Sequence, residues 1–241
     1  MGNKQRKPKK TVLFASGLAF VLLAGGYAAY DYYAGNHVEI ERVIPAGGQA
    51  SSGQASSGGA AAVSAQSLNG TWKVAASSKA YFSVTTSKET VNFVSDQVAG
   101  QWDLNAADPA QSKGQGEVPI ASISSGNGQR DGHIKGKDYL QADAFPKATF
   151  QVSSFEGLPK EWKEGAAVPF KMKGKLNVKG VDKEVTFESN ALYEQGQLKL
   201  SGTTVVTFGD FGMKNPHTVV LEAENNVTVR LELVLSKQAN G

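Results

Sequence analysis

The stretch VPFKMKGKLNVKG, residues 168–180, alternates apolar and polar side chains with a period of two. In a β-strand, successive side chains point to opposite sides of the sheet. The pattern therefore predicts a strand with one buried face and one solvated face. The apolar face consists of Phe170, Met172, Leu176 and Val178, and the polar face of Lys171, Lys173, Lys175, Asn177 and Lys179.

The same alternation recurs on both sides of this stretch, and turn signals separate the runs. Further strands are expected at 79–86, 117–125, 148–155, 198–208 and 227–235. Turns are expected at 126–128, 179–183 and 194–196, and only 136–145 could hold one or two helical turns. These features indicate one all-β antiparallel domain, a barrel or a sandwich. An eight-stranded barrel can hold an elongated ligand or fill its interior with its own side chains, and the pattern leaves both open.

The basic charge of the chain is concentrated at its N-terminus. Residues 1–10 hold five cations and no acid, whereas the rest has 20 basic and 22 acidic residues, which argues against nucleic-acid binding. The 20 residues 11–30 carry no charge, enough for a helix across a bilayer. We expect a cytoplasmic tail at 1–10, a single-pass anchor at 11–33 ending in tyrosines, and an extracytoplasmic remainder. A signal peptide cleaved near 24–29, leaving a secreted or periplasmic protein, is the alternative.

Residues 34–66 are expected to be a flexible linker. After Pro45 the chain is rich in Gly, Ala, Ser and Gln, and GQASSG occurs twice, at 48–53 and 53–58. Such a composition buries too little apolar surface to fold. The short run HVEIERV at 37–43 could pack locally. The folded domain is then expected at 67–237.

Arg130, Asp131 and His133 lie within four positions and could form an active site. An Asp–His pair is the orienting half of a catalytic triad, and His133 with His217 and a carboxylate could bind a metal. The chain has no cysteine, however, and no serine in a nucleophile-elbow context. The simpler interpretation is the end of a hairpin, where Asp131 accepts turn amides and Arg130 or His133 pairs with it. We favour the hairpin.

Three motifs in order resemble the signatures of the YceI-like, polyisoprenoid-binding family. They are RDGHIKGKDYLQADAFPKATF (130–150), GKLNVKGVDKEVTF (174–187) and FGDFGM (208–213). The first follows the pattern Arg-Asp-x-His, then aromatic-Pro, then Thr-Phe. In the second, Asn177 and Asp182 stand where the pattern has threonines, and the arginine expected before the third is absent. The resemblance covers residues 68–237.

The resemblance implies a lipocalin-like antiparallel barrel of about eight strands, exported, that binds an isoprenoid lipid or quinone in a tunnel. It implies no catalysis and no cofactor beyond such a lipid. The RDGH hairpin and the segment around Tyr139 are expected near the mouth, and apolar strand residues inside. The ligand-binding residues expected are Phe82, Val84, Ile120, Arg130, Asp131, His133, Tyr139, Phe145, Phe150, Phe170, Met172, Leu176, Phe187, Phe208, Phe211 and Met213.

Two functions of different class remain, a tethered lipid carrier and a filled barrel that acts through its surface. A hydrolase or metal enzyme built on His133 and Asp131 is a weaker third. Plain core packing is the alternative role for each apolar residue. The lysines at 171, 173, 175 and 179 suit a solvated strand face, or a face resting on anionic lipid headgroups. Monomer and homodimer are both left open.

Overall fold

The computed structural model describes residues 25–27, 29–45, 61–216 and 222–238. The chain divides into two units, residues 1–35 and 36–241, which we describe separately. In the first unit, residues 25–27 and 29–34 are helical. Within the described ranges, no helix has the length and apolar character needed to cross a bilayer. Most of the anchor predicted at 11–33 lies outside these ranges.

The alternating stretch that predicts a strand is β9 (Ala167–Val178), and it pairs with β10 (Val181–Glu194), which pairs with β11 (Gln197–Thr207). Two-residue loops join these strands. Their residues have positive φ, 55° and 73° at Lys179 and Gly180 and 52° and 76° at Gln195 and Gly196. Such turns match the twist of the flanking strands. Two of the predicted turns are therefore confirmed as tight hairpins.

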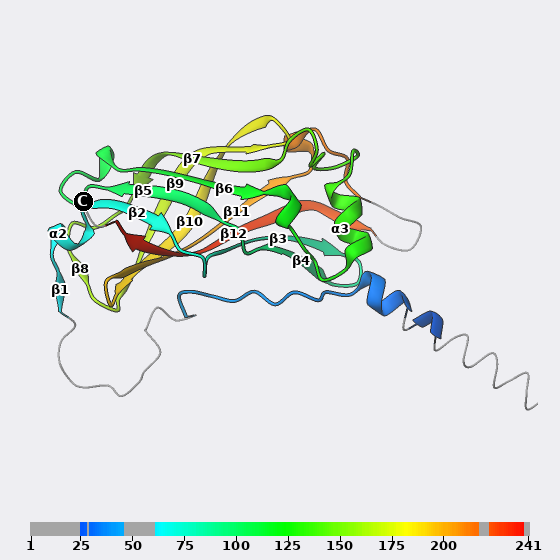
Figure 1. The fold of residues 1–241 in the computed structure, drawn as a ribbon, viewed down its shortest axis with the longest axis horizontal. Coiled ribbons are helices and arrows are strands. Elements are labelled where there is room, and N and C mark those ends of the chain that lie inside the picture. The colour runs from blue at the N-terminus through cyan, green and yellow to red at the C-terminus, as the bar shows by residue number, and fades with distance from the viewer. Residues whose placement is uncertain (1–24, 28, 46–60, 217–221, 239–241) are drawn as a thin grey trace, which may run out of the picture. The chain divides into compact units, whose positions relative to one another are not determined.

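Eight of the strands in the described chain close into an antiparallel barrel. The other five are β2 (Gly70–Val74), β5 (Ala99–Leu104), β6 (Lys113–Pro119), β7 (Lys147–Glu156) and β12 (Ala223–Lys237). The ring runs β11-β10-β9-β7-β6-β5-β2-β12 and closes through the β11–β12 pairing (Figure 1). The barrel of about eight strands is thus confirmed, and the sandwich alternative is wrong.

A hairpin of β3 (Lys79–Thr86) and β4 (Thr90–Ser95) extends the barrel wall. Strand β12 is long enough to pair with β2 near its end and with β3 over 223–232. Strand β4 in turn bridges to the chain after β6, through Val94 and Ser124. On this side of the barrel, β3 and β4 continue the wall from β12 in the α3 half, and β2 and β5 continue it in the other half.

Short elements cover the two ends of the barrel (Figure 1). At one end lie β1 (Ala62–Val63), α2 (Ala65–Leu68), β8 (Trp162–Lys163) and the 3-10 helix η1 (Pro109–Gln111). At the other lie α3 (Gly128–Lys135) and the 3-10 helices η2 (Ile120–Ser122) and η3 (Gly209–Phe211). Because β1 and α2 are ordered, the expected linker does not extend unbroken to residue 66.

Two local predictions about this second end are wrong. The strand expected at 117–125 stops at Pro119, and η2 follows it. The expected hairpin at RDGH is the helix α3, because Asn127 of the turn signal caps its first turn by accepting the N–H groups of Gln129 and Arg130. An asparagine at this position satisfies amides that have no partner inside the helix.

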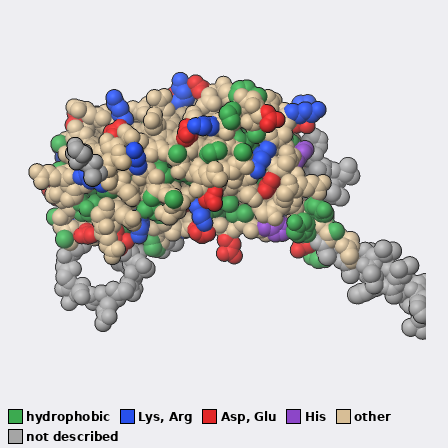
Figure 2. Space-filling model, in the orientation of Figure 1, with side chains coloured by type: hydrophobic (Ala, Val, Ile, Leu, Met, Phe, Trp, Pro, Cys, Tyr) green, Lys and Arg blue, Asp and Glu red, His purple; other side chains and the backbone are tan. Residues whose placement is uncertain are grey.

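The lysines of β9 form ion pairs with acidic residues on neighbouring strands. Lys171 pairs with Glu188 at 2.7 Å, Lys173 with Glu156 at 2.6 Å, and Lys175 with Asp182 at 3.3 Å. Lysines and acids are also interspersed on the face shown in Figure 2. Exposed pairs of this kind contribute about 0–1 kcal/mol each. The arrangement agrees with a solvated strand face.

Candidate ligand cavity

The barrel contains an apolar cavity in its α3 half. Its volume is about 150 Å³, comparable to an apolar cavity that binds benzene. The inner faces of all the surrounding strands contribute to its wall. β12 alone supplies Val227, Val229, Leu231 and Leu233, the same alternation that the sequence shows. Period-2 alternation places these side chains on one face and the polar residues between them outside.

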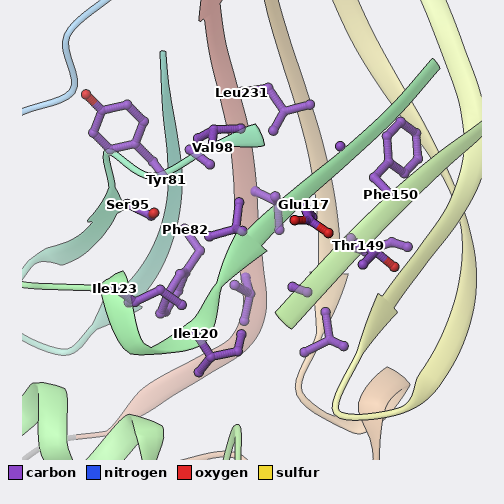
Figure 3. A pocket seen from close by; sticks show the side chains of 18 of the residues that line it. Tyr81, Phe82, Ser95, Val98, Glu117, Ile120, Ile123, Thr149, Phe150 and Leu231 are labelled. Carbon is purple, nitrogen blue, oxygen red and sulfur yellow. The ribbon is translucent and has the colours of Figure 1, made fainter. Parts of the chain in front are cut away.

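Figure 3 shows how the lining side chains converge. Phe82 lies beside Ile120 and Ile123, and Phe150 faces them from across the cavity. The few polar lining groups belong to Tyr81, Ser95, Glu117, Thr149 and Thr207. The cavity can therefore hold an apolar chain by contact alone, with polar atoms available only at separate points.

Half of the predicted binding residues line this cavity. They are Phe82, Ile120, Phe150, Leu176, Phe187, Phe208, Phe211 and Met213. The last three, Phe208, Phe211 and Met213, belong to the third sequence motif, which is held in place at the cavity. Asp210 accepts the N–H of Thr207 at 2.8 Å and pairs with Lys183 at 2.6 Å, which fastens η3 against β10. The Lys183 hydrogen bond, together with the Thr207 N–H, lowers the pKa of Asp210 below its usual range.

The other half lie elsewhere within the described barrel. Val84 and Met172 are buried in the core, and Phe170 lines a second, smaller cavity. Phe145 packs over Gly180, where a Cβ atom would lie 2.6 Å from its ring. Tyr139 packs between the rings of His133 and Phe208, with centroids 5.0 and 6.4 Å away.

The RDGH segment lies in α3, and its Asp131 holds this helix to the preceding loop. Asp131 is 9% exposed and accepts three hydrogen bonds from the preceding loop. They come from the Ser125 N–H at 2.7 Å, the Ser125 hydroxyl at 2.6 Å and the Ser124 hydroxyl at 2.8 Å. In a triad the carboxylate orients a histidine instead. Here Asp131 accepts one amide and two hydroxyls of the loop before α3, not the amides of a hairpin, and the exposed His133 contacts Tyr139.

Tyr139, which packs against His133 of α3, has a shifted pKa. Burial, and then the charge of Asp138, raise the pKa of the Tyr139 phenol above its usual value. The hydroxyl therefore stays neutral at physiological pH. Among the described residues, no group of three His, Cys, Asp or Glu side chains is placed to hold a metal ion.

Several lining residues were not predicted, although some carried a signal. The sequence pattern marks the inward residues of β12 as strand residues, without marking them as binding residues. Trp102, Val98, Ala148, Ile123 and Ile134 also line the cavity. Ile123 and Ala148 fall in the strands predicted at 117–125 and 148–155, but no alternation marks them as inward. Trp102, Val98 and Ile134 lie outside the predicted strands.

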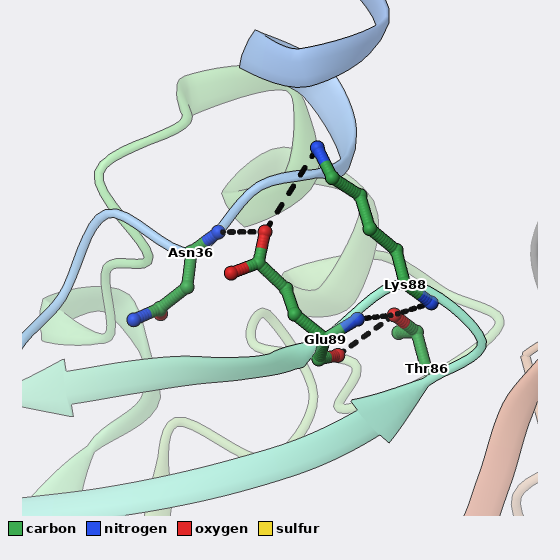
Figure 4. Close-up of polar contacts among 4 residues, drawn as sticks. All are labelled: Asn36, Thr86, Lys88 and Glu89. Atoms are coloured by element: carbon green, nitrogen blue, oxygen red, sulfur yellow. Dashed lines mark hydrogen bonds and ion pairs between the residues drawn. The ribbon is translucent and has the colours of Figure 1, made fainter.

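The segment 36–45, which we call the edge segment, lies along the outside of the wall. The Asn92 N–H donates to the Asn36 side chain at 2.8 Å, and the Glu41 N–H donates to the Tyr81 hydroxyl at 3.2 Å. Figure 4 shows its start, where the Asn36 N–H donates to Glu89 at 3.1 Å. This part of the expected linker is thus ordered on the barrel, as the run at 37–43 suggested.

The edge segment covers a buried carboxylate. Glu232 points outward from β12, is 1% exposed and accepts the Val43 N–H at 3.0 Å. Arg230 approaches it at 3.5 Å. Burial is the largest influence and raises the pKa of Glu232, against the opposing effects of Val43, Arg230 and Arg42. The folded protein therefore retains a proton here at pH values where the unfolded chain has lost it.

This retention predicts a pH-dependent stability. Because the folded pKa lies above the unfolded one, the free energy of unfolding should fall as pH rises from the ordinary glutamate range near ~4.3 through the raised value. Glu232→Gln should remove that loss, raising the melting temperature at pH 7 but not at pH 4, by about 2–4 °C per kcal/mol. Melting curves at both pH values, with the exposed Glu188→Gln as control, test this. An equal gain at pH 4 would contradict it.

The fold is a closed antiparallel β-barrel with an apolar cavity inside it. The chain belongs to the YceI-like domain family, whose sequence profile matches residues 72–235. A UPF0312 protein of Shewanella oneidensis is 32% identical over 123 residues, which is 48% of this chain and 60% of that protein. The corresponding protein of Pseudomonas savastanoi is 28% identical over the same share. The matched region thus spans about 60% of the length of these relatives.

Solved structures share the fold at low identity. BcnA of Burkholderia cenocepacia has a TM-score of 0.57 at 20% identity, covering 67% of this chain and 98% of that one. A polyisoprenoid-binding domain of Saccharophagus degradans has a TM-score of 0.57 at 12% identity, covering 70% and 99%. The Campylobacter jejuni YceI protein has a TM-score of 0.51 at 19% identity, covering 62% and 86%.

Proposed function

We propose that this protein binds the chain of an isoprenoid lipid, such as a polyprenol or a quinone tail, inside its barrel. The observation that carries the proposal is the apolar cavity of about 150 Å³ inside the barrel. A filled barrel acting only through its surface would be expected to pack this volume with side chains. The polyisoprenoid-binding domain of S. degradans, which shares the fold, gives the ligand class further support.

The energetics of such a ligand suit the cavity wall. Burial contributes ~0.8 kcal/mol for each methylene-sized group, or about 4 kcal/mol for each five-carbon isoprene unit. A cavity of about 150 Å³ is comparable to one that binds benzene, so as it stands it holds about one such unit. Each further unit that the barrel admits adds a similar gain, against an association cost of ~4 kcal/mol or more. Contact with the apolar wall, not polar recognition, therefore supplies the affinity.

The N-terminal sequence supports a location at a membrane. The uncharged residues 11–30 follow the basic residues 1–10, an order typical of a membrane anchor with the following domain outside the cytoplasm. Tyr27, Tyr32 and Tyr33 are 70%, 52% and 55% exposed, as suits rings at a lipid–water interface. A barrel tethered in this way stays close to the bilayer that contains its ligand. We propose binding and carriage, not catalysis.

Native mass spectrometry of the full chain, expressed in bacterial membranes and released in mild detergent, tests the proposed function. We expect an added mass that solvent extraction identifies as a polyprenyl lipid or an isoprenoid quinone. As a control, the extract is compared with lipids recovered from an unrelated membrane-tethered protein prepared identically. A mass without ligand, unchanged after incubation with polyprenols, would contradict the proposal.

A further inference from the structure

The barrel contains a second apolar cavity, which we call the lower cavity. Its volume is about 30 Å³, and it lies at the α2 end of the barrel. Its wall includes Leu68, Phe155, Phe170, Ala191, Leu198 and Leu200. We call the larger cavity at the α3 end the upper cavity. Nothing in the ligand-binding proposal so far uses the lower cavity.

One layer of side chains separates the two cavities. Leu200 lines the lower cavity, and its direct partner across the β11–β12 ladder, Leu233, lines the upper one. Paired residues of neighbouring strands lie only about 5 Å apart. On β9, the fully buried Met172 lies between Phe170 of the lower cavity and Leu176 of the upper one. The partition is therefore thin.

Trp102 belongs to the walls of both cavities. Its indole lies over glycines of β5 and β6. A Cβ atom on Gly114 would lie 2.7 Å from its Nε1 atom, so a larger residue there would collide with the indole. A Cβ atom on Gly100 would lie 3.1 Å from the ring but only 2.3 Å from the carbonyl oxygen of Gln115, so the backbone of β6 excludes it first. The glycines thus leave the space in which this ring forms part of the partition.

The indole N–H of Trp102 differs from those of Trp72 and Trp162 in its hydrogen bonding. Trp72 donates its Nε1 proton to the Leu68 carbonyl at 2.8 Å, and Trp162 donates to the Pro159 carbonyl at 3.0 Å. Trp102 is 2% exposed, but within the described structure its Nε1 atom has no hydrogen-bond partner. A buried donor without a partner is costly, and moving it breaks no hydrogen bond.

We propose that Trp102 is a gate between the cavities, and that its displacement opens the lower cavity to the end of a long isoprenoid chain. The residues of β12 that line the upper cavity run from Val227 to Leu233, about 20 Å along the strand at ~3.3 Å per residue. A short chain ends above the partition. A longer chain can add contacts only by passing Trp102. The gate rests on the proposed isoprenoid binding and makes Trp102 a determinant of chain length.

Fluorine NMR of the full chain labelled with 5-fluorotryptophan tests the gate directly. The three tryptophans give three resonances, and Trp102→Phe identifies the one from the gate. The probes are geranylgeraniol as the short chain and solanesol as the long one. We expect solanesol to shift the Trp102 resonance strongly and geranylgeraniol to leave it near its position. Trp72 and Trp162, anchored to backbone carbonyls, serve as internal references.

A filled lower cavity provides the second measurement. Ala191→Phe places a ring there and should weaken solanesol binding about tenfold, the loss of about two buried methylene-sized groups, with geranylgeraniol unchanged. If Ala191→Phe does not unfold cooperatively, Leu198→Phe is used as the cavity-filling variant in its place. If both alcohols bind but the Trp102 resonance stays in place, or filling weakens both equally, the gate is wrong and the isoprenoid function stands. If neither alcohol binds, both proposals are wrong.

Discussion

Ala148→Trp is expected to reduce isoprenoid binding at least 100-fold while the barrel stays folded. Ala148 is half-buried on β7, and both it and its cross-strand partner Val118 line the upper cavity. An indole at this position projects into the space that the chain would occupy. A 100-fold loss corresponds to about 2.7 kcal/mol, the contacts of only three or four methylene-sized groups.

The cost to the fold should be smaller than the cost to binding. Adding bulk to a packed interior destabilises by about 1–3 kcal/mol, within the 5–15 kcal/mol stability of a typical domain. Titration with geranylgeraniol, followed by native mass spectrometry, measures the binding. Gln151→Trp adds the same ring to the exposed face of β7 and should bind normally. Full binding by Ala148→Trp would place the ligand outside the upper cavity.

Asp131→Ala is expected to cause the largest loss of stability. The substitution removes the acceptor of three hydrogen bonds and leaves the buried N–H and hydroxyl of Ser125 without that acceptor. Hydrogen bonds to charged groups and stranded buried donors together predict a loss of about 3–5 kcal/mol. Because Ile134 and Leu140 line the upper cavity, loosening α3 should also weaken ligand binding.

Urea unfolding followed by circular dichroism measures this loss. Asp143→Ala is a matched control, because Asp143 is exposed in a nearby turn and its removal should change stability by less than about 0.5 kcal/mol. The hydrogen-bond account would be refuted if Asp131→Ala unfolded at the same urea concentration as the unsubstituted protein. A catalytic role of Asp131 would instead predict normal stability and lost turnover.

Much of the barrel could be predicted because several strands show their period directly. The inward residues of β9, β11 and β12 alternate with polar ones, and Lys179-Gly180 and Gln195-Gly196 mark tight turns. Strand β6 shows no such alternation, since its inward positions include Gly114 and Gly116. At Gly114 a Cβ atom would lie 2.7 Å from the indole of Trp102, so the ring from the neighbouring strand requires a small residue there. That reason is visible only once the strands are paired.

The departures from the second family signature have a similar explanation. Asn177 and Asp182 replace two threonines, which looks like two separate losses in the sequence. The two residues are cross-strand partners, and the Asn177 amide donates to the Asp182 carboxylate at 2.6 Å. The Asn177–Asp182 pair therefore stands where the family pattern has a pair of threonines. The hairpin keeps a polar contact across its two strands.

The sequence alone determined the all-β class, the main strands, two hairpin turns and the three motifs, because these depend on the order of neighbouring residues. Only the tertiary structure decided that Asp131 fastens α3, that residues 36–45 cover Glu232, and that Trp102 stands between two cavities. Each of these depends on residues far apart in the chain. Closing the barrel brings them together, and no local pattern records which side chains then meet.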